Sequence, residues 1–265
     1  MDVGLMVTAF GDVDLADVAV RAESQGYDAV WVGELWGASG VVQATEMACR
    51  TEAIEIGTAI LNVYSRSPAV LAMTAASLED ASDGRFTLGL GTSTAAAVED
   101  LHGMAFDRPV RRAHETIELL REFTAGTGEP VDYDGELLAA AAFPSIESAV
   151  PIYHAGLGPA NRRVVGRLCD GWIPHNIPFS RLDDAFEEVA TAARERDRDP
   201  DDITIAPTCP RRSARTRQRP ATRCGDTSRT TSEAARGIVE RSQPSSRMRR
   251  TGSPRCGATA RRARP

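Results

Sequence analysis

Residues 54–93 read IEIGTAILNVYSRSPAVLAMTAASLEDASDGRFTLGLGTS, and this stretch decides the fold. Ile54 to Leu61 is apolar and β-compatible, as expected of a strand that is buried on both faces. Ser67-Pro68 is a favourable helix start, and apolar residues recur at helical spacing as far as Asp83. Asp83-Gly84 then turns the chain into a second apolar run. Because parallel strands need a crossover helix, the stretch predicts a parallel β-α-β unit.

The same alternation continues on both sides of this unit. Strands are expected at residues 3–8, 28–33, 54–61, 86–90, 150–155, 170–174 and 202–206. Helices are expected at residues 12–25, 41–50, 68–83, 107–123, 160–169 and 181–196. Thr92 or Ser93 is the expected N-cap of a further helix start, and residues 131–137 suggest a small surface hairpin. Regular alternation favours an α/β, (β/α)8 TIM-barrel-like fold that is incomplete, with seven βα units.

Composition narrows the class of protein. The 265 residues suffice for a full core. No run approaches the ~18 consecutive apolar residues that a transmembrane helix needs, so no membrane partner is expected. The first ten residues, MDVGLMVTAF, do not resemble a secretory signal. The five cysteines show no CxxC spacing, which favours free thiols and a cytoplasmic location.

Charge divides the chain into two parts. Every basic residue is Arg, and residues 1–209 hold 34 acids against 15 Arg, whereas residues 210–265 hold 3 acids against 16 Arg. An acidic, lysine-free surface is typical of a halophilic protein, which stays soluble when salt screens charge repulsion. A GC-rich genome that favours Arg and Ala codons explains the same composition, and both explanations can hold.

The alternation of expected strands and helices ends near residue 208. The chain therefore divides into a barrel domain, residues 1–208, and an Arg-rich low-complexity segment, residues 209–265. Few apolar residues follow, so a disordered basic tail is expected. Non-specific nucleic-acid binding is one interpretation, without a specific nucleic-acid partner. The preferred hypothesis is a frameshift near codons 208–211, which the nucleotide sequence would test.

Two glycine-rich strand ends are candidate ligand sites. Gly156-Leu157-Gly158 lies between an expected strand and an expected helix, where backbone amides can approach a phosphate. An ordinary βα turn is the simpler explanation for such a loop. At the end of the fourth strand, small residues leave room for a ring and hydroxyls can bind polar oxygens; these residues are Gly89, Gly91, Thr92 and Ser93.

Three segments together resemble the luciferase-like monooxygenase superfamily, especially its coenzyme F420-dependent, methylenetetrahydromethanopterin reductase-like branch. They are LADVAVRAESQGYDAVWVGE (residues 15–34), NVYSRSPAVLAMTAASLEDASDGRFTLGLGTS (residues 62–93) and IYHAGLGPANRRVVGRLCDGWI (residues 152–173). The second is close to the family pattern N-P-Y-x-R-x-P…L-D-x-x-S-x-G-R-x-x-L-G-x-G. The likeness covers roughly residues 1–208.

The resemblance implies a barrel that binds F420, or alternatively FMN, at the carboxyl ends of its strands, and it suggests a homodimer. The residues expected to contact the cofactor are Ala59, Ile60, Asn62, Gly89, Gly91, Thr92, Ser93, Gly156, Leu157, Gly158 and Asn176. The resemblance also implies a cis peptide bond between Ala59 and Ile60. This chain departs from the family where Ala59 replaces Gly and Val63 replaces Pro.

A carboxylate follows the second strand at Glu34, where the family usually has Asp followed by His. Glu34 is the candidate catalytic residue, since a carboxylate there can bind the ring or tune a substrate proton. Leu35 stands where that His would be, so this position cannot supply an imidazole. Thr8, Trp36, Arg66 and His175 are candidates for the substrate pocket, although each has a structural explanation. His102 and His114 are expected on the surface, and no metal motif is present.

These observations favour an oxidoreductase that transfers a hydride between F420 and a small organic substrate. An FMN-dependent luciferase-like monooxygenase is the alternative within enzymes. A truncated or frameshifted barrel without catalytic function is the alternative outside them.

Overall fold

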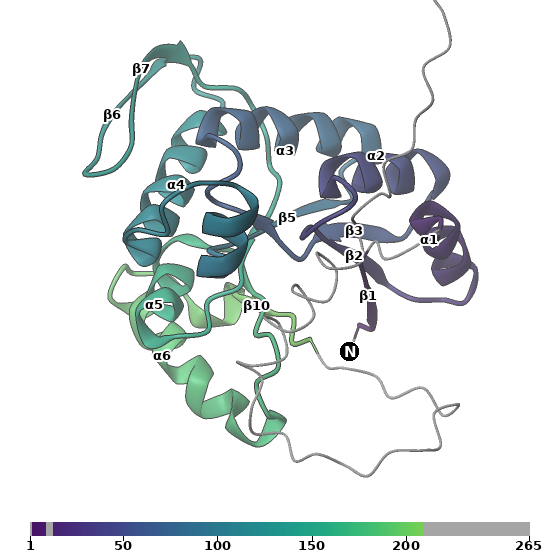
Figure 1. Ribbon diagram of the computed structural model, residues 1–265. Helices are drawn as coiled ribbons and strands as arrows, with labels where there is room; N and C mark the ends of the chain where they lie inside the picture. Colours follow the sequence, from purple (N-terminus) through teal and green to yellow (C-terminus); the bar gives the residue numbers. More distant parts are fainter. Residues whose placement is uncertain (1, 9–12, 209–265) are drawn as a thin grey trace, which may run out of the picture. The chain divides into compact units, whose positions relative to one another are not determined.

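A computed structural model describes residues 2–8 and 13–208 of the chain (Figure 1). Its strands are β1 (Gly4–Thr8), β2 (Ala29–Gly33), β3 (Glu55–Thr58), β4 (Leu61–Asn62), β5 (Phe86–Gly91), β6 (Pro130–Asp134), β7 (Ala139–Pro144), β8 (Ile152–His154), β9 (Gly171–Trp172) and β10 (Thr204–Ile205). Its α-helices are α1 (Leu15–Ser24), α2 (Gly40–Arg50), α3 (Pro68–Ser82), α4 (Pro109–Phe123), α5 (Pro159–Leu168) and α6 (Leu182–Arg194). Shorter turns are the π-helical η1 (Ala97–Leu101) and the 3-10 turns η2 (Phe179–Arg181) and η3 (Pro200–Asp202).

The main sheet is parallel and follows the chain in order, β1-β2-β3-β5-β8-β9-β10, with β4 also paired to β5. Figure 1 shows the helices along the outside of this curled sheet. The described chain therefore has the incomplete α/β, TIM-barrel-like fold that the sequence predicts, but of the seven strands in this order only the first six are followed by an α-helix in residues 2–8 and 13–208. Among the described residues, β1 pairs only with β2 and β10 only with β9.

Apolar strands and helix faces form the core, as the sequence pattern requires. β5 is buried at all six positions, and its Leu88 and Leu90 have no exposed surface. The helices α3, α4 and α5 add Leu71, Ile117 and Val165, which are also fully buried. A sheet buried on both faces places its ligand-binding edge at the strand ends.

Local signals set the bounds of α3. The Ser67 hydroxyl accepts a hydrogen bond from the Val70 amide, and Pro68 occupies the first turn. Asp83 adopts a left-handed conformation with φ of 54° at the end of the helix, and Gly84 follows with φ of 77°. The expected turn into β5 is therefore confirmed. The expected surface hairpin is also confirmed as the longer pair β6 and β7, which projects from one side in Figure 1.

The expected third strand, residues 54–61, is wrong as a continuous element. It is interrupted between β3 and β4, and the bond between Ala59 and Ile60 is cis. Gly57 pairs with Thr87, but Leu61 pairs with Leu90, so this strand carries one more residue than its neighbour across the gap. The extra residue prevents continuous pairing.

The expected N-cap after β5 is also wrong. Neither Thr92 nor Ser93 caps the following turn; the Thr94 hydroxyl accepts from the Ala97 amide instead. Ser93 has a positive φ of 57°, which is not the extended conformation that an N-cap adopts. The cap therefore lies one residue later, and the hydroxyls of Thr92 and Ser93 are left for other contacts.

Candidate active site at the carboxyl ends of the strands

The strand ends bring together several of the predicted site residues. The Glu34 amide, just after β2, donates to the Ile60 carbonyl at 3.4 Å. Asn62 lies opposite Gly91, and the Val63 amide donates to the Gly91 carbonyl. The ends of β2, β4 and β5 therefore form one continuous rim.

Glu34 is held in a closed hydrogen-bond network on this rim. Both terminal guanidinium nitrogens of Arg66, Nη1 and Nη2, donate to its carboxylate, at 2.6 and 2.8 Å, and the Gly40 amide donates at 2.7 Å. The two side chains are only 12% and 18% exposed. Burial raises the pKa of Glu34, but the bonds from Arg66 and Gly40 outweigh it, so the pKa is lowered overall. Glu34 is therefore a fixed anion rather than a proton carrier near neutral pH.

Gly89 has a packing role inside β5. A Cβ on Gly89 would lie 1.7 Å from the Thr58 carbonyl oxygen, so no side chain fits. The Thr58 hydroxyl donates to the Gly89 carbonyl and accepts from its amide, both at 2.9 Å. This side chain bridges the strands where β3 and β4 are interrupted. Contact between Gly89 and a cofactor stays a prediction, because packing alone explains the glycine.

Asn62 organises the turn after β4. Its Oδ1 accepts from the amides of Tyr64 and Ser65, at 3.0 and 2.7 Å, and its Nδ2 lies 3.2 Å from Nε2 of His102. His102 is exposed, as expected, and directly follows η1. Its contact with Asn62 was not predicted, because nothing in the sequence connects positions 40 residues apart.

The loop after β8, residues 156–158, differs from the rim because its backbone amides have no hydrogen-bond acceptor within the described chain. The Gly156 carbonyl accepts from the Trp172 indole, and the Leu157 carbonyl accepts from the Arg162 guanidinium. The amides of Gly156, Leu157 and Gly158 donate no hydrogen bond within the described chain. A Cβ on Gly158 would meet nothing within 4 Å. Free amides at the start of α5, beside open space, fit the phosphate group of a cofactor such as F420 or FMN.

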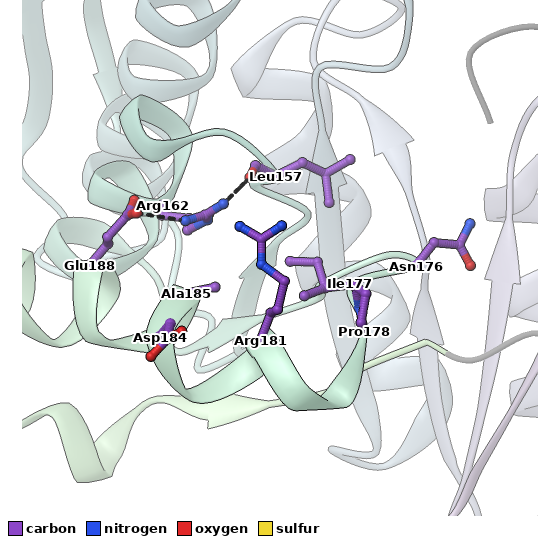
Figure 2. A pocket seen from close by; sticks show the side chains of 9 residues that line it. All are labelled: Leu157, Arg162, Asn176, Ile177, Pro178, Arg181, Asp184, Ala185 and Glu188. Carbon is purple, nitrogen blue, oxygen red and sulfur yellow. Dashed lines mark hydrogen bonds and ion pairs between the residues drawn. The ribbon is translucent and has the colours of Figure 1, made fainter. Parts of the chain in front are cut away.

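A cavity of about 230 Å³ lies next to this loop, between α5 and the start of α6 (Figure 2). Arg162 pairs with Glu188 at 2.9 Å along one wall. Figure 2 shows the Arg181 guanidinium pointing toward the loop. Arg181 has no side-chain partner among residues 2–8 and 13–208. Asn176 lies at one end of the cavity and has a positive φ of 57°.

The remaining candidates do not form a cluster. Thr8 ends β1 opposite Gly33 and is exposed, and Trp36 is 62% exposed. Nδ1 of His175 lies 2.7 Å from the Thr208 hydroxyl. His154, by contrast, is fully buried, and burial lowers its pKa. Its ring nitrogens lie near the Leu90 carbonyl and the Asn161 side chain, so it connects β5 to α5.

Metal-binding groups and membrane-spanning helices are both absent from the described part of the chain. In the described ranges, no group of three or more His, Cys, Asp and Glu side chains is arranged to hold a metal ion. None of the helices in the same ranges is both long and apolar enough to cross a membrane.

A curled parallel sheet with helices along its outside places this chain in the class of TIM-barrel-like α/β proteins. Residues 11–248 match the model of the luciferase-like monooxygenase family, and the chain belongs to that family. The 5,10-methylenetetrahydromethanopterin reductase of Methanolobus tindarius is 32% identical over 197 residues, which cover 72% of this chain and 59% of the relative. The chain thus spans little more than half the length of that relative.

Solved structures show the same fold. An F420-dependent secondary alcohol dehydrogenase in complex with an F420-acetone adduct aligns with a TM-score of 0.71 and 24% identity, over 78% of this chain and 68% of that one. Riboflavin lyase with modified FMN aligns with a TM-score of 0.69 and 16% identity, over 78% of this chain and 61% of that one. At these identities the likeness concerns the fold. Both expected cofactor classes occur among the similar proteins.

Proposed function

We propose that this chain is an oxidoreductase that transfers a hydride between coenzyme F420 and a small organic substrate. The observation that carries the proposal is the open loop after β8, where three free amides lie beside open space at Gly158. The family membership and the reductase relative support F420 as the cofactor.

Several residues would hold the cofactor. The amides of Gly156, Leu157 and Gly158 would bind its phosphate, and the unbonded hydroxyls of Thr92 and Ser93 would bind polar oxygens near it. When bound, F420 supplies the deazaflavin carbon that accepts or donates the hydride. On the rim, Ala59, Ile60, Asn62 and Gly91 are the proposed ring contacts.

The chain's own side chains orient and shield the reacting groups. Because Arg66 and Gly40 hold Glu34 in its ionised form, Glu34 fixes the rim and offers a negative charge instead of a proton. Thr8, Trp36, Arg66 and His175 are the proposed substrate contacts, and Asn176 beside the cavity is a proposed cofactor contact. The homodimer that the resemblance suggests stays a prediction.

Fluorescence titration with F420 tests the proposal. Gly158→Asp places a carboxylate among the free amides, in open space, and should weaken F420 binding about tenfold or more through like-charge repulsion. Val42→Asp adds the same charge on α2, where Val42 is 53% exposed, and should leave binding unchanged. Absence of quenching in the unsubstituted chain, or equal binding by both variants, would overturn the proposal.

The FMN alternative is tested in the same titration, since tighter quenching of FMN than of F420 would favour a monooxygenase. The inactive alternative is favoured by one observation: β1 and β10 are the two ends of the sheet in the part of the chain that is described. A cooperative thermal transition that shifts upward with F420 would argue against it. Salt-dependent DNA affinity that disappears on truncation at Thr208 would instead support nucleic-acid binding.

A further inference from the structure

Two side chains hold the carbonyl groups of the loop after β8. The Trp172 indole donates to the Gly156 carbonyl at 2.8 Å, and the Arg162 guanidinium donates to the Leu157 carbonyl through Nε at 3.1 Å and Nη2 at 2.7 Å. The peptide bonds that follow these carbonyls are trans, so in each peptide plane the N–H points opposite to the C=O. Trp172 and Arg162 therefore fix the directions of the Leu157 and Gly158 amides.

Both of these side chains are held in turn by α6. Trp172 is fully buried, and its ring stacks on that of Phe186 with the ring centroids 6.4 Å apart. Nη1 of Arg162 pairs with Glu188 at 2.9 Å, and the Arg162 side chain is only 15% exposed. Figure 2 shows Arg162 bonded on both sides, to Glu188 and to the loop. Packing against α6 therefore sets how the loop presents its amides.

Gly158 is the residue at which this restraint matters most. Its φ is −87°, and turning the peptide plane between Leu157 and Gly158 over would change that φ to a positive value. Glycine adopts positive φ about as readily as negative φ, so the Gly158 backbone itself does not oppose the change. The inverted plane would present the Leu157 carbonyl oxygen where the Gly158 amide now lies, and its partial negative charge would repel an anion. The bonds from Arg162 oppose this inversion.

We propose that Arg162 is a positioning residue that holds the peptide between Leu157 and Gly158 so that the Gly158 amide faces a bound phosphate, and that Trp172 does the same for the Leu157 amide. This rests on the proposed function, in which these amides bind the phosphate of F420. Arg162 and Trp172 each act through a backbone carbonyl rather than by contact with the phosphate. Trp172 should matter less, because inverting its peptide would force a positive φ on Leu157, which a residue with a side chain disfavours.

The first test needs no cofactor and reads the Leu157 carbonyl by NMR. Protein labelled with [¹³C′]leucine and [¹⁵N]glycine gives one signal for each Leu-Gly pair, and the chain has such pairs at residues 88–89, 90–91 and 157–158. Losing a hydrogen bond moves a carbonyl ¹³C signal to higher field. Arg162→Met should therefore move the signal of pair 157–158, which Leu157→Met assigns by removing it, and leave the other two in place as internal controls. An unmoved signal would overturn the proposal.

The second test is the fluorescence titration with F420. Arg162→Met should weaken F420 binding about threefold to tenfold, as expected for one misdirected hydrogen bond. Arg162→Lys, which keeps the charge and a donor, should restore part of the affinity. Arg163→Met is the matched control, because it removes the same charge from the next, exposed position of α5, and it should leave binding nearly unchanged. An equal loss in Arg163→Met would show that charge alone is responsible and would contradict the proposal.

A double variant separates the orientation of the peptide from packing. A Cβ on Gly158 would meet nothing within 4 Å, so Gly158→Ala has room for its methyl group, and alanine resists the positive φ that the inverted peptide needs. Arg162→Met combined with Gly158→Ala should therefore bind F420 more tightly than Arg162→Met alone. Equal or weaker binding by the double variant would overturn the proposal, because a methyl group repairs neither a lost charge nor lost packing around Arg162.

The proposed role of Arg162 and the proposed function fail in different ways. If the unsubstituted chain does not quench F420 fluorescence, the proposed function is wrong, and a moved Leu157 signal would leave Arg162 with a role in the loop alone. If F420 binds equally well to the unsubstituted chain and to Arg162→Met, the role of Arg162 is wrong and the proposed function stands.

Discussion

At the ends of β2 and β4 the polar side chains of Glu34 and Asn62 are hydrogen-bonded, whereas at the end of β8 the backbone amides have no partner among the described residues. On the first side, Glu34 accepts three hydrogen bonds from Arg66 and Gly40. On the second side, the loop amides of residues 156–158 donate none within the described chain. The difference separates a rim whose polar side chains are already hydrogen-bonded from a loop whose amides still have hydrogens to donate.

Substituting Gly89 on the rim and Gly158 in the loop after β8 should change the free energy of unfolding by the most unequal amounts. Gly89→Ala forces a methyl group to 1.7 Å from the Thr58 carbonyl oxygen and should destabilise the fold by about 3 kcal/mol or more. Gly158→Ala enters open space with an ordinary φ of −87° and should change the free energy of unfolding by at most about 1 kcal/mol. Urea unfolding of both variants measures this, and equal losses would remove the distinction between the sides.

The ion pair on the organised rim should show a smaller effect that depends on pH. Arg66→Ala leaves Glu34 buried without its cation and should cost about 3 kcal/mol at neutral pH. Because the folded pKa of Glu34 is lowered, its stabilising contribution is present above the unfolded value, ~4.3, and is lost as pH falls through the folded pKa. The loss caused by Arg66→Ala should therefore shrink in acid.

A double variant provides the control for the ion pair. Glu34→Gln combined with Arg66→Met removes both charges and should destabilise less than Arg66→Ala alone, since no buried charge is left uncompensated. Thermal unfolding from pH 7 down to about pH 3 compares the variants. A loss for Arg66→Ala that does not change with pH would show that packing, rather than charge, carries the effect.

The sequence predicted the order of the strands and helices because apolar periodicity and caps such as Ser67-Pro68 are local signals. It failed where the outcome depends on pairing between strands. The interruption between β3 and β4 follows from the register of Gly57 and Leu61 against β5, which no single strand encodes. The contact between Asn62 and His102 was missed for the same reason, since it depends on where η1 places a residue 40 positions away.

The smallest effect on stability is expected at Arg181, in the cavity beside the loop after β8. Arg181 has no side-chain partner in the described ranges, so Arg181→Ala should change the free energy of unfolding by less than about 0.5 kcal/mol. Arg162→Ala is the comparison, because Arg162 is 15% exposed, pairs with Glu188 and holds the Leu157 carbonyl; it should cost about 1–3 kcal/mol. If Arg181 instead serves a bound anion, its loss should lower F420 affinity while leaving stability unchanged. A stability loss for Arg181→Ala equal to that for Arg162→Ala would show that both cations belong to the fold.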